Sequence, residues 1–221
     1  MPGNSTPQVC PRSRARLAAM LVWGLGATLP AGAKTAQPSA PVLTVRVFDN
    51  VGLPGRELRA AALAAQRIFR EAGVESTWLL CSCCPEQPGQ DSDCHQHQHF
   101  GDLNVGIPRP MQIGLSVSDS SFGAAIFTPD GRPTAHTYVF YERVEKMAKK
   151  APCSVKELLG SVMAHELGHL LLGRAHSPRG LMSRKWDRRA LARVARGDLW
   201  FGDDEARRLQ AAVGQLLLAA K

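Results

Sequence analysis

The order of apolar and polar positions along the chain predicts a mixed α/β domain. Residues 42–48 are β-branched and apolar almost without interruption, which indicates a central strand. Residues 57–72 repeat apolar side chains on one helical face and end at Gly73, so they predict an amphipathic helix. Residues 75–80 then predict a second strand. A strand, a helix and a strand in this order form a right-handed crossover whose strands are parallel.

The pattern resumes after a polar, proline-bearing loop at residues 81–99. Ser154 and Glu157 form a capping box, which fixes the start of a long helix over residues 155–172. The remaining predicted elements are strands at 103–107, 113–117, 122–128 and 137–141, the last two forming a hairpin, and helices at 187–195 and from a cap at Asp203. The chain therefore has the elements of one α/β domain of the α+β type, and we find no internal repeat.

The first 33 residues differ from the rest of the chain. A basic segment at residues 12–16 precedes an apolar run at 17–29 and small residues at 31–33. This order is typical of a secretory signal peptide, and the run is shorter than the ~20 residues of a membrane-spanning helix. We expect a signal peptide at 1–33, a linker at 34–41 and a single domain at 42–221. The protein would then be exported, periplasmic or extracellular, without stable membrane insertion after cleavage.

The net charge of +8 falls to +5 without the signal peptide, because residues 1–33 hold three arginines and no acidic residue. This charge is modest. It could favour acidic partners or envelope polymers, but a solvated basic surface that keeps the protein soluble is the favoured interpretation. No nucleic-acid motif accompanies it, so we expect a peptide or protein substrate and no nucleic acid. The sequence leaves the oligomeric state open.

The segment 161–182 holds the side chains that a hydrolytic metal centre requires. His165 and His169 are four residues apart, so a helix places both imidazoles on one face, where they can share a cation. Glu166 points about 100° round the helix from His165. Its carboxylate is therefore placed beside the metal, where a general base for an activated water belongs.

Three features follow this helix in the sequence. Gly173 can end the helix with a positive φ, and His176 comes three residues later as the candidate third ligand. Met182 lies after a turn and could form an apolar floor under the metal. Asp187 is the nearest downstream carboxylate that could replace His176.

The run HELGHLLLGRAH and the following SPRGLM resemble the zincins and, within them, the metzincins, whose pattern is HExxHxxGxxH followed by a methionine turn. The HS after the glycine and the LM of the turn are most similar to the matrixin branch. The chain departs from the pattern by one residue, because Leu172 stands at the family's glycine position and Gly173 follows it. The helix is expected to run one residue longer, a shift of about 1.5 Å and about 100° that bears on the placement of His176.

The resemblance implies a metzincin-like catalytic domain with a mixed twisted sheet, an edge strand over the cleft, the HExxH helix and a C-terminal helix. Residues 122–128 would be the edge strand and would hold an extended peptide by strand addition. The resemblance also implies Zn²⁺ bound by His165, His169 and His176, with Glu166 as general base. The expected activity is that of an exported metallopeptidase, with endopeptidase favoured over exopeptidase.

The loop at 81–99 supports other interpretations. Disulfides are common in exported proteins, so we expect at least one bond that closes residues 81–94. Alternatively, Cys94 with the alternating His95, His97 and His99 could bind a second metal. The chain would then be an exported metal-binding protein with a structural or degenerate zincin site. A third hypothesis is a zincin-fold hydrolase that cuts a non-protein amide.

Overall fold

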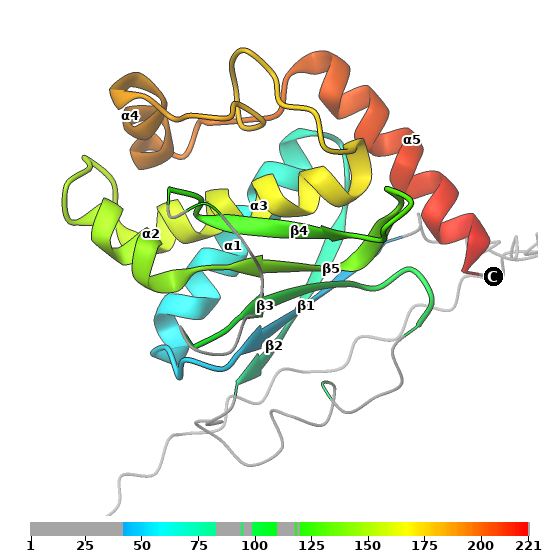
Figure 1. Cartoon of the computed structure of the whole chain (residues 1–221), viewed down its shortest axis with the longest axis horizontal. Helices are drawn as coiled ribbons and strands as arrows, with labels where there is room; N and C mark the ends of the chain where they lie inside the picture. Colours follow the sequence, from blue (N-terminus) through cyan, green and yellow to red (C-terminus); the bar gives the residue numbers. More distant parts are fainter. Residues whose placement is uncertain (1–41, 83–93, 95–98, 110–117, 119, 221) are drawn as a thin grey trace, which may run out of the picture. The chain divides into compact units, whose positions relative to one another are not determined.

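The computed structural model describes residues 42–82, 94, 99–109, 118 and 120–220. Its elements in chain order are β1 (Leu43–Asp49), α1 (Gly55–Glu71), β2 (Ser76–Ser82), β3 (Leu103–Ile107), β4 (Gly123–Phe127), β5 (Pro133–Val139), α2 (Tyr141–Ala148), α3 (Val155–Leu172), α4 (Arg188–Arg196) and α5 (Asp203–Ala219) (Figure 1). The predicted α/β class is confirmed.

The strands form one sheet in the order β2-β1-β3-β5-β4. Strand β1 is parallel to β2 and to β3, and β3 is parallel to β5, so the parallel pairing predicted for the first two strands is confirmed. Strand β4 runs antiparallel to β5 and lies at the edge of the sheet. The hairpin and the edge strand that the resemblance implies are therefore present, although β5 begins at Pro133 and not at residue 137.

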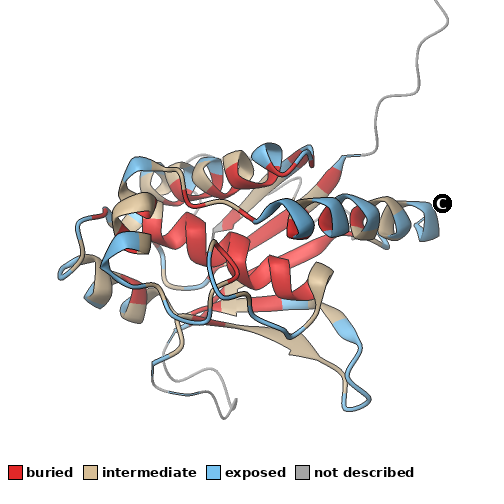
Figure 2. Cartoon of the chain, turned by 90° about the horizontal axis from the view of Figure 1, so that it is seen from above, coloured by how far each residue is buried: buried red, intermediate tan, exposed pale blue. Residues whose placement is uncertain are grey.

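The core lies between the sheet and the two longest buried helices. Helix α1 packs against β2, helix α3 packs against β4 and β5, and the two helices pack against each other. Gly160 permits this close crossing, because a Cβ on it would lie 2.5 Å from the Ala61 carbonyl oxygen. Figure 2 shows α3 buried over most of its length, whereas the outer face of α5 is exposed.

Both predicted ends of α3 are confirmed. The Ser154 hydroxyl accepts a hydrogen bond from the Glu157 N–H, and the Glu157 carboxylate accepts one from the Ser154 N–H at 3.1 Å. The helix continues through Leu172 and ends at Gly173, which has a φ of +94°. Because a side chain strains this backbone region, glycine is the residue suited to the position.

The end of the hairpin differs from the prediction. Strand β5 ends at Val139, and Tyr141 begins α2 instead of ending the strand. The Tyr141 hydroxyl donates to the Glu57 carboxylate at 2.8 Å, a contact between residues far apart in the sequence. Helix α2 was not predicted.

The cap of the last helix also differs by one residue. The N-cap of α5 is Gly202 and not Asp203, and the Gly202 N–H donates to the Glu205 carboxylate at 2.7 Å. The strand predicted at 113–117, the signal peptide and the linker lie outside the described residues. None of the described helices is long and apolar enough to cross a membrane.

Candidate metal centre

The structure brings together the three histidines that the sequence singles out. His165 and His169 lie one turn apart on α3, with their Nε2 atoms 3.1 Å apart. His176 approaches from the segment after the helix, and one ligand nitrogen from each ring lies within 4.8 Å of the others. The two helical histidines are buried and His176 is exposed, so the cluster has one open side.

Backbone carbonyls orient the two buried imidazoles. The Nδ1–H of His165 donates to the Leu181 carbonyl at 2.7 Å, and the Nδ1–H of His169 donates to the Gly173 carbonyl at 3.0 Å. A carbonyl only accepts hydrogen bonds, so each proton is on Nδ1 and each Nε2 lone pair faces the centre of the cluster. This is the tautomer that a metal ligand needs.

Burial also keeps the rings neutral. It lowers the pKa of His165 to about 4, and it lowers the pKa of His169 and of His176 below the usual value. Three neutral imidazoles that converge on one point are a donor set typical of Zn²⁺, and they leave further coordination positions open. The cluster could therefore hold a zinc ion.

The residue added before the glycine does not prevent His176 from reaching the cluster. The positive φ of Gly173 turns the chain sharply out of the helix after Leu172. The Ser177 N–H then donates to the Met182 carbonyl at 2.9 Å, which ties the histidine-bearing segment to the turn. The position of His176 is thus set by the turn and not only by its spacing from the helix.

Met182 is buried and packs directly against α3 between the two helical histidines. A Cβ on Gly168 would lie 2.6 Å from the Met182 sulfur and 3.0 Å from the Phe201 ring. Only glycine lets the methionine approach the helix this closely. A glycine inside a predicted helix signals such a packing constraint, and this signal could have identified the contact from the sequence.

Glu166 lies between α3 and the edge strand. Its side chain packs on the β4 backbone, since a Cβ on Gly123 would lie 2.6 Å from the Glu166 Cγ. The carboxylate accepts a hydrogen bond from the Ala125 N–H, whereas burial raises the pKa of Glu166 to about 8. A buried carboxyl with a pKa near neutrality can take up and release a proton close to the three histidines.

Trp186 contacts the site by packing and by a hydrogen bond. Its ring lies edge-on to His165, with the centroids 5.7 Å apart. Its indole N–H donates at 3.1 Å to the same Leu181 carbonyl that accepts from His165. No local sequence pattern predicts a contact between residues 165 and 186.

The other candidates lie outside the histidine cluster. Asp187 is the N-cap of α4, where its carboxylate accepts from the Ala190 N–H at 2.8 Å. Cys81 and Cys94 form the expected disulfide. A disulfide sulfur is not a thiolate ligand, so the second-metal hypothesis loses Cys94.

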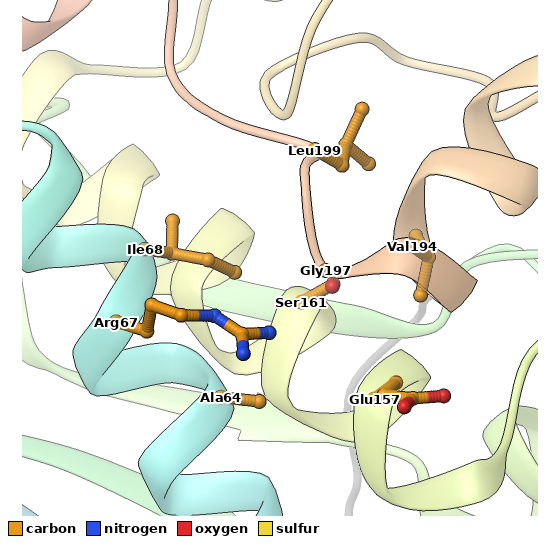
Figure 3. A pocket seen from close by; sticks show the side chains of 8 residues that line it. All are labelled: Ala64, Arg67, Ile68, Glu157, Ser161, Val194, Gly197 and Leu199. Atoms are coloured by element: carbon orange, nitrogen blue, oxygen red, sulfur yellow. The ribbon is translucent and has the colours of Figure 1, made fainter.

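A small pocket lies apart from the cluster, between α1, α3 and the segment after α4 (Figure 3). Arg67 extends into it toward Gly197, and its Nε is buried without a hydrogen-bond partner among the described residues. None of the residues that line the pocket is a proposed metal ligand or the proposed general base.

The fold and the histidine cluster together define a metzincin-like architecture. The chain is similar to the crystal structure of archaemetzincin from Methanopyrus kandleri, with a TM-score of 0.52 and 18% identity, over 80% of this chain and 98% of that chain. No protein-family model and no curated protein matches the sequence. The similarity supports the metzincin-like fold and does not distinguish a matrixin branch within it.

Proposed function

We propose that the chain is an exported zinc-dependent metallopeptidase. The observation that carries the proposal is the convergence of three neutral imidazoles beside the buried Glu166. His165, His169 and His176 are the proposed ligands. The Cys81–Cys94 disulfide supports export, because such bonds persist in oxidising compartments.

Zinc bound by these ligands supplies a Lewis acid that lowers the pKa of water and polarises a carbonyl. The chain's own residues provide the remaining functions. Glu166 takes the proton of the attacking water and returns it to the departing amine. The carbonyls of Leu181 and Gly173 keep two imidazoles in the ligating tautomer throughout.

The edge strand β4 supports a peptide substrate over a smaller one. Ala124 directs its carbonyl toward β5, where the Thr137 hydroxyl donates to it at 3.0 Å. Main-chain groups alternate between the two sides of an antiparallel strand, so those of Gly123 and Ala125 face the free edge. An extended peptide added at this edge would pass beside Glu166. A strand that continues past the reacting group favours endopeptidase activity.

The test uses zinc-loaded protein, its metal content measured by mass spectrometry, and internally quenched peptides blocked at both ends. Glu166→Gln should keep one zinc per chain and lose roughly 10²–10⁴ in kcat/KM, the usual contribution of a general base. Glu145→Gln, which changes an exposed acid on α2, is the matched control and should cleave normally. Activity retained in Glu166→Gln would remove this residue from the mechanism.

The ligand assignment needs a separate measurement. His176→Ala should weaken zinc binding while leaving the fold intact, because the side chain is exposed. An unchanged zinc affinity would exclude it as a ligand. Intact peptidoglycan assayed beside proteins and peptides would show whether the scissile amide lies in a protein.

A further inference from the structure

An arginine is held at one end of the edge strand. The Arg174 guanidinium carbon lies 4.4 Å from the centre of the Phe127 ring, and Phe127 is the last residue of β4. Arg174 is exposed, yet this stacking restricts where its charge can lie. It follows Gly173 directly, so the turn that delivers His176 also places the guanidinium.

The distance from the reacting groups follows from the strand itself. The Ala125 N–H binds the Glu166 carboxylate, and Phe127 is two residues further along β4. Two strand residues span at most about 7 Å, and the pairing of β4 with β5 is irregular between Ala125 and Phe127, so the Phe127 backbone lies no more than about 7 Å along the edge from the Ala125 N–H. A peptide lying along β4 would therefore bring a side chain about two residues from the scissile bond to the guanidinium.

The charge on this arginine is not neutralised within the described part of the chain. The ion pairs among the described residues involve other side chains. No carboxylate of a described residue pairs with Arg174 or with Arg184. Arg184 is also exposed, and its charge acts on His176. Two guanidinium groups without an ion pair among the described residues thus lie on the segment that carries His176 and on the turn that follows it.

We infer that Arg174, stacked on Phe127, selects peptides that carry an aspartate or glutamate about two residues from the scissile bond. This inference rests on the proposed peptidase function and names its substrate class. A planar guanidinium binds a carboxylate through two parallel hydrogen bonds, and its position is set before the substrate arrives. The pair stays solvent-exposed, so the expected selectivity is modest.

The experiment compares quenched peptides that differ only in having glutamate, glutamine or lysine at one position. The substituted position moves over three residues on each side of the cleaved bond. At one position, kcat/KM should be roughly fivefold higher for glutamate than for glutamine, the upper range for an exposed ion pair, and lowest for lysine. The preference should shrink when the salt concentration rises from 50 to 500 mM, because exposed charges are screened.

Variants assign the preference to the arginine. Arg174→Gln should reduce the glutamate-to-glutamine ratio to about one, and Phe127→Leu should reduce it in part, with Phe127→Tyr restoring it. Arg59→Gln is the matched control, since it removes an exposed arginine from α1, which packs over β2 at the opposite edge of the sheet. A ratio unchanged in Arg174→Gln, or lowered equally in Arg59→Gln, would overturn the inference.

Failure of the peptidase proposal gives a different result. Peptides cleaved without any charge preference would refute the inference and leave the peptidase proposal standing. If no peptide is cleaved, fluorescence anisotropy of the same peptides with zinc-loaded Glu166→Gln protein still decides the inference. The inference is supported if the glutamate peptide binds more tightly and if this preference is lost in the double variant Glu166→Gln with Arg174→Gln. Equal binding of all peptides would refute it.

Discussion

Replacing Gly168 by alanine tests whether Met182 must lie directly against the metal-binding helix. Position 168 is inside α3, between the two helical histidines, and an added Cβ would meet the Met182 sulfur at 2.6 Å and the Phe201 ring at 3.0 Å. Gly214 offers a matched control in α5, because a Cβ there has no heavy atom within 4 Å. Both substitutions change the helix propensity by the same amount and differ only in packing.

The magnitude follows from two opposing effects. Alanine stabilises a helix interior by about 1 kcal/mol relative to glycine, so Gly214→Ala should raise the free energy of unfolding by about that amount. At Gly168 the same gain is offset by overpacking, which costs about 1–3 kcal/mol in a close-packed core. The flexible end of Met182 can yield, whereas the Phe201 ring yields less easily. We expect Gly168→Ala to lower the free energy of unfolding by up to about 2 kcal/mol.

Urea denaturation of the metal-free protein measures the change in the free energy of unfolding, and competitive zinc titration measures the change in zinc affinity. Displacing Met182 should disturb the floor of the cluster and lower zinc affinity roughly tenfold, the lower range for residues that support ligands. The double variant Gly168→Ala with Met182→Val should recover stability relative to the two single changes, because it makes room for the new methyl group. The reasoning is refuted if Gly168→Ala stabilises the protein as much as Gly214→Ala does.

Three further predictions concern the site and its surroundings. Burial raises the pKa of Glu166 from 4.5 to about 8, which penalises the folded state fully above pH 8 and not below pH 4.5. Glu166→Gln should therefore stabilise the metal-free protein on the order of 2–4 kcal/mol at pH 8 and not at pH 4. Denaturation midpoints of the variant and the unsubstituted protein that are equal at pH 8 as well as at pH 4 would contradict this. Trp186→Phe keeps an aromatic ring, though a smaller one, and removes the N–H that donates to Leu181. Zinc affinity should therefore fall about tenfold in a chelator competition, and an unchanged affinity would leave Trp186 with packing alone. Reducing the disulfide between Cys81 and Cys94, which are 13 residues apart, should lower the unfolding free energy by about 2–3 kcal/mol, visible as a lower Tm that Ala substitution of both cysteines reproduces.

The parts of the site that were predicted correctly depend on local patterns. The capping box at Ser154 and the glycine at 173 fix the ends of α3, and a helix of known phase places His165 and His169 on one face. The turn after residues 122–128 was enough to predict a hairpin, whereas the edge position of its first strand was implied by the resemblance to the metzincins. These features need only near neighbours in the sequence, so the sequence alone specifies them.

The parts that were missed depend on contacts between distant residues. Leu181 accepts hydrogen bonds from both His165 and Trp186 through its main chain, so its side chain carries no signal of this role. Helix α2 shows the opposite case. Its apolar residues Val144 and Met147 have helical spacing, but the predicted strand ran through Tyr141 and residues 142–148 were given no element.

Two buried ionisable groups that are costly to the metal-free fold lie in the proposed site. Burial disfavours protonation of His165 and ionisation of Glu166, so both groups lose their preferred charge states in the fold. Two other buried carboxylates are compensated by contacts: Asp102 pairs with Arg46 at 3.0 Å, and Asp49 accepts from the N–H groups of Val51, Gly52 and Leu53. Buried groups held away from their preferred charge states are typical of functional sites, where binding of a cation can offset their cost to the free energy of folding.

The extra residue before Gly173 shows which constraint the site obeys. A pattern that requires glycine three residues after His169 rejects this chain, although His176 still joins the cluster. The spacing that persists is the one from glycine to the third histidine, because the positive φ and the bond from Ser177 to Met182 act after the helix has ended. Since α3 can lengthen at its C-terminus without moving His165 or Glu166, an insertion there changes only the path of the turn. Insertions between residues 165 and 169 would instead rotate one imidazole by about 100° per residue and separate the ligands.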